Sequence, residues 1–135
     1  MIWIALIEFL LVMTPTSIKG LVDIHIFLGV FIIGLAFYNF GRLRGTSVPG
    51  RVKRIARATG LMTVLAAIFG VLLYSNLGSG WTLFFGVTMW EVFLFLHDLT
   101  AFAIITQAAA VAFALSIILS RASPLLVLLP PPHKM

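Results

Sequence analysis

The fold is decided by residues 21–40, LVDIHIFLGVFIIGLAFYNF, an apolar run of 20 residues that holds a single carboxylate, Asp23. His25 lies near its start and Tyr38 lies near its end. About 20 apolar residues in an α-helix cross the hydrocarbon core of a bilayer, and tyrosine favours the membrane–water interface. The run therefore predicts a membrane-spanning helix with His25 close to one membrane surface.

Three other segments of the chain have the same character. Residues 1–18 begin with MIWIALIEFLLVM and are short for a span, residues 58–74 are apolar, and residues 92–120 form the longest apolar segment. The chain is 61% hydrophobic and 10% charged, which is too little polar surface for a small soluble domain. These features predict an all-α, integral membrane four-helix bundle with a short first helix, organised as a single transmembrane domain over residues 1–135.

Basic residues and prolines mark the segments outside these predicted spans. Residues 41–57 form a predicted loop, and residues 122–135 form a Pro-rich tail in which three successive prolines cannot continue a helix. Lys and Arg are enriched in cytoplasmic loops near anionic lipid headgroups. We therefore expect the loop and both termini on the cytoplasmic side of the cell membrane, with the lipid bilayer and no nucleic acid as a partner. Six of the nine basic residues lie in this loop: Arg42, Arg44, Arg51, Lys53, Arg54 and Arg57.

Two histidines and three of the four carboxylates gather at the ends of the spans away from the basic loop. Asp23 and His25 lie at the start of one span, and Glu91, His97 and Asp98 lie at the start of another. Ionisable residues within a membrane are costly and mark functional sites. Both histidines are expected close to the outer membrane surface.

Small residues share a helix face with each histidine. Gly29 follows His25 by four residues and Ala101 follows His97 by four, which is the spacing of neighbours on one helix face. Small side chains at these positions leave room for a flat macrocycle between helices, and they equally allow close helix packing. Histidine is a standard axial ligand of haem iron, and an acceptor then holds its second ring nitrogen.

The pattern favours a haem b whose iron is bound by two histidines, with nearby carboxylates polarising the imidazoles or neighbouring water. Two alternatives stay open: polar residues wetted at the interface, or a copper, iron or quinone site. The chain has no Cys, which excludes thiolate ligands and iron–sulfur clusters. The candidate site residues are His25 and His97 as ligands, Gly29 and Ala101 as small neighbours, and Asp23, Asp98 and Glu91 as supporting acids.

The order of these parts resembles the half-size, four-helix unit of the haem A synthase family and, more loosely, small membrane b-type cytochromes. The resemblance covers about residues 21–120 and implies a haem held near the outer face. In that family a glutamate stands three residues before the first of the paired histidines, whereas this chain has Val22 there. The matching residues are His25 with Gly29, residues 67–70 with Val71, and His97 with Ala101.

Two hypotheses about function follow. The first is a small membrane b-type cytochrome-like subunit that holds one haem between His25 and His97 and transfers electrons in a respiratory complex, with a quinone as a possible partner. The second is a cofactor-free accessory subunit whose polar residues contact other membrane subunits of a larger enzyme complex. Whether the chain itself catalyses a reaction is left open at this point.

Overall fold

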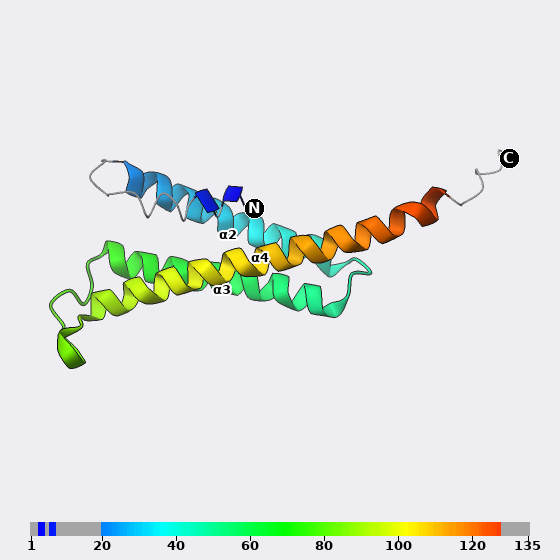
Figure 1. The fold of residues 1–135 in the computed structure, drawn as a ribbon. Helices are drawn as coiled ribbons and strands as arrows, with labels where there is room; N and C mark the ends of the chain where they lie inside the picture. Colours follow the sequence, from blue (N-terminus) through cyan, green and yellow to red (C-terminus); the bar gives the residue numbers. More distant parts are fainter. Residues whose placement is uncertain (1–2, 5, 8–19, 128–135) are drawn as a thin grey trace.

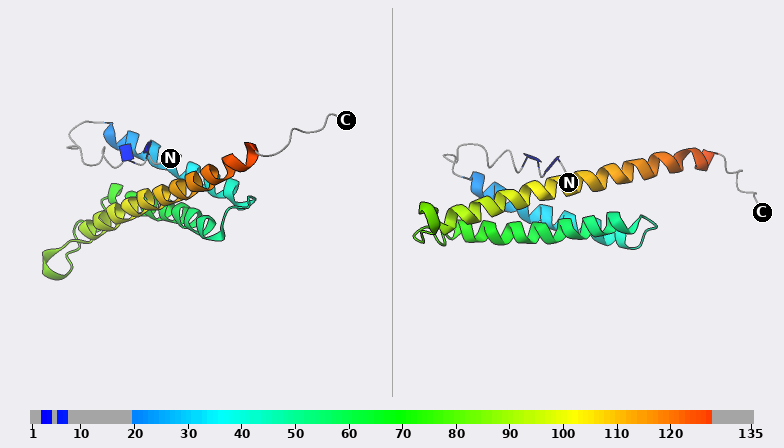
Figure 2. Two further views of the ribbon diagram at one scale, coloured as in Figure 1. Left: turned by 45° about the vertical axis from the view of Figure 1, so that its right-hand side comes forward. Right: turned by 60° about the horizontal axis from the view of Figure 1, so that its bottom comes forward.

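The computed structural model describes residues 3–4, 6–7 and 20–127, which form three long α-helices lying side by side (Figure 1). These are α2 (Leu21–Arg44), α3 (Gly50–Tyr74) and α4 (Met89–Val127). α2 and α4 run in the same direction and α3 runs against both, as the views in Figure 2 also show. α3 packs against each neighbour, whereas no described α-carbon of α2 lies within 8 Å of one in α4. α3 therefore forms the floor of a groove between α2 and α4.

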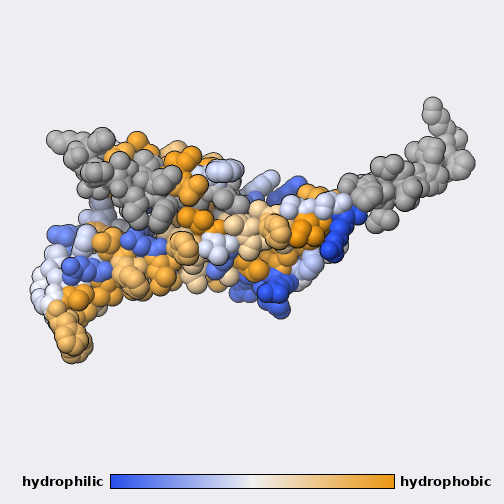
Figure 3. Space-filling model, in the orientation of Figure 1, coloured by the Kyte–Doolittle hydropathy of each residue, from blue (hydrophilic) through white to orange (hydrophobic). Residues whose placement is uncertain are grey.

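All three helices are long and apolar enough to cross a membrane. α2 has 24 residues and α3 has 25. At a rise of about 1.5 Å per residue, each extends beyond the roughly 30 Å of a bilayer's hydrocarbon core. Large apolar side chains such as Phe27, Val30 and Phe102 are exposed along their sides. Figure 3 shows this apolar surface between hydrophilic patches near the two ends of the bundle. The structure thus agrees with the predicted helical membrane class.

The described residues do not support the predicted count of four helices, because they contain three candidate spans. The first predicted span, residues 1–18, lies outside the described residues apart from positions 3, 4, 6 and 7. The last helix is longer than expected, since α4 begins at Met89 and continues to Val127. It includes the first residues of the predicted tail, whose final part, residues 128–135, is also outside the described residues.

The predicted loop over residues 41–57 is mostly helical. α2 continues to Arg44 and α3 begins at Gly50, so only residues 45–49 connect them. Charge limits how much of a helix enters the hydrocarbon core, but Arg and Lys are good helix formers and extend the helices into the headgroup region. The Lys53 ammonium closes the turn by donating hydrogen bonds to the carbonyls of Arg44 at 3.2 Å and Thr46 at 2.6 Å.

A small hairpin joins α3 to α4. The Leu83 N–H donates to the Val87 carbonyl at 2.7 Å, around a single 3₁₀ turn over Phe84–Gly86. Phe85 has a φ of 60° and is fully exposed at the tip. The hairpin projects sideways from the bundle in Figure 1, and its tip is apolar in Figure 3.

Small and β-branched residues form the buried seam of the bundle. Membrane helices associate through such residues because lipid provides no hydrophobic drive between helices. The Thr59 hydroxyl lies 2.9 Å from the Ile55 carbonyl oxygen and 3.1 Å from the Gln107 amide oxygen, and these two acceptors share its single proton, which links α3 to α4. The buried side chains are Ile32 and Ala36 on α2, Val52, Ala56, Thr59, Thr63 and Ala66 on α3, and Thr100, Ile104 and Ala108 on α4.

Candidate functional site

The groove between α2 and α4 widens into a hollow of about 710 Å³ at the end where both helices begin. All three helices line it, and its walls are mainly aliphatic. Pockets that take small molecules and cofactors are typically about 300–1,000 Å³ and mostly apolar with a few placed polar groups. The lining side chains that carry polar atoms are His25, His97, Asp98, Thr63, Tyr74 and Trp90. The hollow therefore has the size and composition of a cofactor site.

His97 is held in one orientation by the backbone of α3. Its Nδ1 lies 2.9 Å from the carbonyl oxygen of Ala66. Because a carbonyl can only accept, Nδ1 must carry the proton, and this fixes the neutral imidazole as the tautomer with a lone pair on Nε2. Metal-bound histidines use this arrangement, in which one ring nitrogen donates to a backbone carbonyl while the other binds the metal.

Gly70 makes the approach of His97 to α3 possible. It lies one helical turn beyond Ala66, where a side chain would cover the Ala66 carbonyl. A Cβ atom at Gly70 would sit 3.3 Å from Cε1 and 3.7 Å from Nδ1 of His97. The first distance is tighter than most real contacts, so the imidazole would have to shift. The missing side chain is thus part of how His97 is positioned.

His25 meets His97 across the groove. The centroids of the two imidazole rings are 5.8 Å apart, and the ring planes make an angle of 69°. Each histidine is only partly exposed, and each lines the hollow. The two residues are 72 positions apart in sequence and come from helices whose backbones do not touch, so the side chains alone bridge this part of the groove.

The three predicted supporting acids differ in placement. Asp98 lines the hollow and is half-buried, whereas Asp23 is exposed and does not line it. Glu91 is exposed and is engaged with the connecting hairpin. Its Oε2 accepts hydrogen bonds from the Thr88 N–H at 2.7 Å and hydroxyl at 2.9 Å, while the Thr88 hydroxyl accepts from the Glu91 N–H. Such reciprocal bonds form a capping box at the start of α4.

Small residues that the sequence analysis singled out line this hollow. Gly29 and Ala101, the predicted small neighbours of the histidines, both line it. Ala67, Gly70 and Val71 of α3 line it as well. Sequence reasoning missed the Ala66 carbonyl, because every residue has a carbonyl and its use depends on the register of two helices. Gly70, one helical turn after Ala66, was the sequence feature that could have indicated a close approach to this carbonyl.

Comparisons with known proteins give no match: no family model fits the chain, and no curated protein or solved structure is significantly similar. The class of protein is therefore defined by the fold and the site, as a multi-pass helical membrane protein with two facing histidines in a groove between helices. In the described part of the chain, no three His, Asp or Glu residues gather as a metal site.

Proposed function

We propose that the chain is a small membrane cytochrome-like subunit that binds one haem b between His25 and His97 and transfers electrons in a respiratory complex. The observation that carries the proposal is the pairing of a tautomer-fixed His97 with His25 across an apolar groove. A porphyrin supplies four nitrogen ligands of its own, so two imidazoles complete the coordination of its iron.

The separation of the two rings supports this coordination. Bonds between a metal and an imidazole nitrogen are about 2 Å long, so two imidazoles on opposite sides of one metal place their ring centroids about 6 Å apart. The measured distance between the His25 and His97 centroids is 5.8 Å. The separation of the rings therefore matches that of two imidazoles on one metal.

The side chains that line the hollow also favour the binding of a flat apolar ligand. Gly29, Ala67, Gly70 and Ala101 contribute little or no side-chain bulk beside the histidines. Longer aliphatic and aromatic side chains, among them Trp90, line the same hollow. An apolar environment around a haem, together with its axial ligands, sets the reduction potential of the iron.

A bound haem of this kind supplies one-electron transfer, and the protein controls its ligands and surroundings. In this chain His97 would be the oriented ligand, because the Ala66 carbonyl holds its Nδ1–H and directs the Nε2 lone pair away from α3. His25 would complete the pair from α2. Asp98, which lines the same hollow, would polarise the imidazoles or neighbouring water. A membrane quinol is the chemical class of donor that an apolar groove suits.

The second candidate is a cofactor-free accessory subunit of a multi-subunit membrane enzyme complex. It is favoured by the apolar tip of the hairpin, where Phe84 and Phe85 are 84% and 104% exposed. Exposed aromatic side chains of this kind are enriched where proteins meet partners, and also at membrane interfaces. On this alternative, the two histidines pack the groove and bind nothing.

A reduced-minus-oxidised absorption spectrum of the purified protein tests the proposal. We expect haem α and Soret bands in the natural protein, their loss or marked change in both His25→Ala and His97→Ala, and no change in His133→Ala. The His133 variant controls for the loss of a histidine as such. A featureless spectrum from protein purified with its native partners would reject the haem and favour the accessory subunit.

A further inference from the structure

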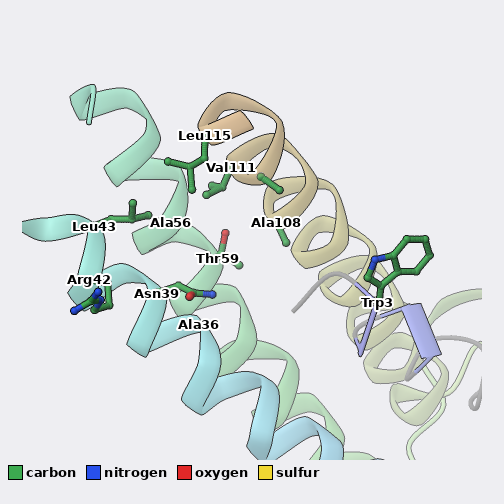
Figure 4. Close-up of a pocket in the computed structure, with 11 residues that line it drawn as sticks. Trp3, Ala36, Asn39, Arg42, Leu43, Ala56, Thr59, Ala108, Val111 and Leu115 are labelled. Atoms are coloured by element: carbon green, nitrogen blue, oxygen red, sulfur yellow. The ribbon is translucent and has the colours of Figure 1, made fainter. Parts of the chain in front are cut away.

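The groove between α2 and α4 contains a second hollow, of about 370 Å³, at the end opposite the histidines. Figure 4 shows α2 on one side of it and α4 on the other, with Thr59 of α3 between them. Most of its lining is apolar, from residues such as Ala108, Val111 and Leu115 of α4. Asn39 and Arg42 of α2 line it on the other side.

Positive charge is concentrated around this hollow. Five arginines are exposed on the adjoining ends of α2 and α3: Arg42, Arg44, Arg51, Arg54 and Arg57. The described carboxylates are Asp23, Glu91 and Asp98, which lie toward the other end of the bundle. Asp23 and Arg42 are 19 residues apart on one helix, a distance of about 28 Å. No described acid is therefore close enough to neutralise the Arg42 guanidinium.

The hollow thus combines an apolar floor with a cationic rim. A headgroup phosphate can accept hydrogen bonds from a guanidinium, and an acyl chain can lie along the apolar side chains of α4. Basic pockets between membrane helices at the cytoplasmic surface bind anionic lipid headgroups in this way. The other exposed arginines add to the positive electrostatic potential near the hollow but do not line it.

We infer that this hollow is a binding site for one phospholipid with an anionic headgroup, whose phosphate pairs with Arg42 while one acyl chain lies between α2 and α4 against Val111, Ala112 and Leu115. The site is separate from the hollow lined by the two histidines, because no residue lines both hollows. The bound lipid would fix the spacing of α2 and α4, which do not pack directly on one another.

Native mass spectrometry of the full chain in detergent, titrated with phosphatidylglycerol, tests the site. We expect one lipid to bind with an affinity that Arg42→Gln lowers about fivefold, which is the usual effect of one basic residue on an anionic lipid. Ala112→Phe should weaken binding further, because the larger side chain would fill part of the hollow. The matched controls are Arg54→Gln on α3 and Ala110→Phe on α4, which alter exposed residues that do not line the hollow. Both controls should bind as the natural chain does.

Four outcomes would overturn the inference. Equal binding of phosphatidylcholine would remove the need for an anionic headgroup, and equal binding of glycerol 3-phosphate would show a site for the free anion. An equal loss of lipid affinity in Arg54→Gln would show that the lipid is attracted by the overall positive charge and not by a specific contact with Arg42. Binding seen only after deletion of residues 1–18 would mean that the chain's own first segment, whose Trp3 also lines the hollow, is the occupant.

Discussion

Among single residues, Gly70 has the clearest consequence for the proposed haem site. Its lack of a side chain lets the His97 imidazole reach the Ala66 carbonyl, and a Cβ atom there would already press on Cε1 of the ring at 3.3 Å. Gly70 thus leaves room for the hydrogen bond that holds the proton on Nδ1 of His97. Outer partners of metal-bound histidines generally affect metal affinity in this indirect way.

We predict that Gly70→Leu weakens haem binding by about 10- to 100-fold, the usual cost of losing the hydrogen-bond partner of a metal-bound histidine. The leucine side chain would displace the imidazole from Ala66 and occupy part of the hollow. Gly34→Leu is the matched control, because a Cβ at Gly34 meets nothing within 4 Å. Haem titration of the two purified variants measures the difference. Equal affinities would contradict the role assigned to the His97–Ala66 hydrogen bond.

The histidines themselves could be singled out from the sequence, since polar residues stand out in apolar segments. Gly29 and Ala101, each four residues after a histidine, line the same hollow as the histidines. The roles of the acids could not be read in the same way. Glu91 lies six residues before His97, but its carboxylate bonds to Thr88 of the hairpin. The flexible side chain of a glutamate can reach several partners, and only the folded backbone decides which of them it bonds to.

Among the helices, hydropathy located the centres of three spans and misjudged their ends. Residues 50–57 were predicted as loop because they are basic, yet they form the first two turns of α3. Val52 and Ala56 are buried there with the same spacing as Thr59 and Thr63 further along. The helical period of these small residues was the better guide. The pairing of α3 with both neighbours, and the gap between α2 and α4, depend on side-chain packing that a hydropathy pattern does not contain.

At the scale of the whole molecule, charge separates the two ends of the bundle. The arginines gather near the α2–α3 turn, and the described carboxylates lie with the histidines toward the other end. Because Lys and Arg are enriched on the cytoplasmic side of membrane proteins, we expect the basic end to face the cytoplasm and the hollow lined by the two histidines to lie near the outer surface. The proposed haem and the proposed lipid would then occupy opposite leaflets.

We predict that single cysteines report this orientation, and the natural chain has none to interfere. Ser79→Cys, in the exposed α3–α4 connection, should react with a membrane-impermeant maleimide in intact cells. Ser47→Cys, in the exposed α2–α3 turn, should react only after permeabilisation. The reverse labelling pattern would place the histidine groove at the cytoplasmic surface and would contradict the predicted topology.

We propose that His25 and His97 bind one iron from opposite sides. The electron paramagnetic resonance spectrum of the oxidised, purified protein tests this pairing, because two imidazole ligands make ferric haem low-spin. We expect a low-spin signal that becomes high-spin or disappears in His25→Ala and in His97→Ala. A high-spin signal in the natural protein, or a low-spin signal that survives either substitution, would contradict the pairing of these two histidines.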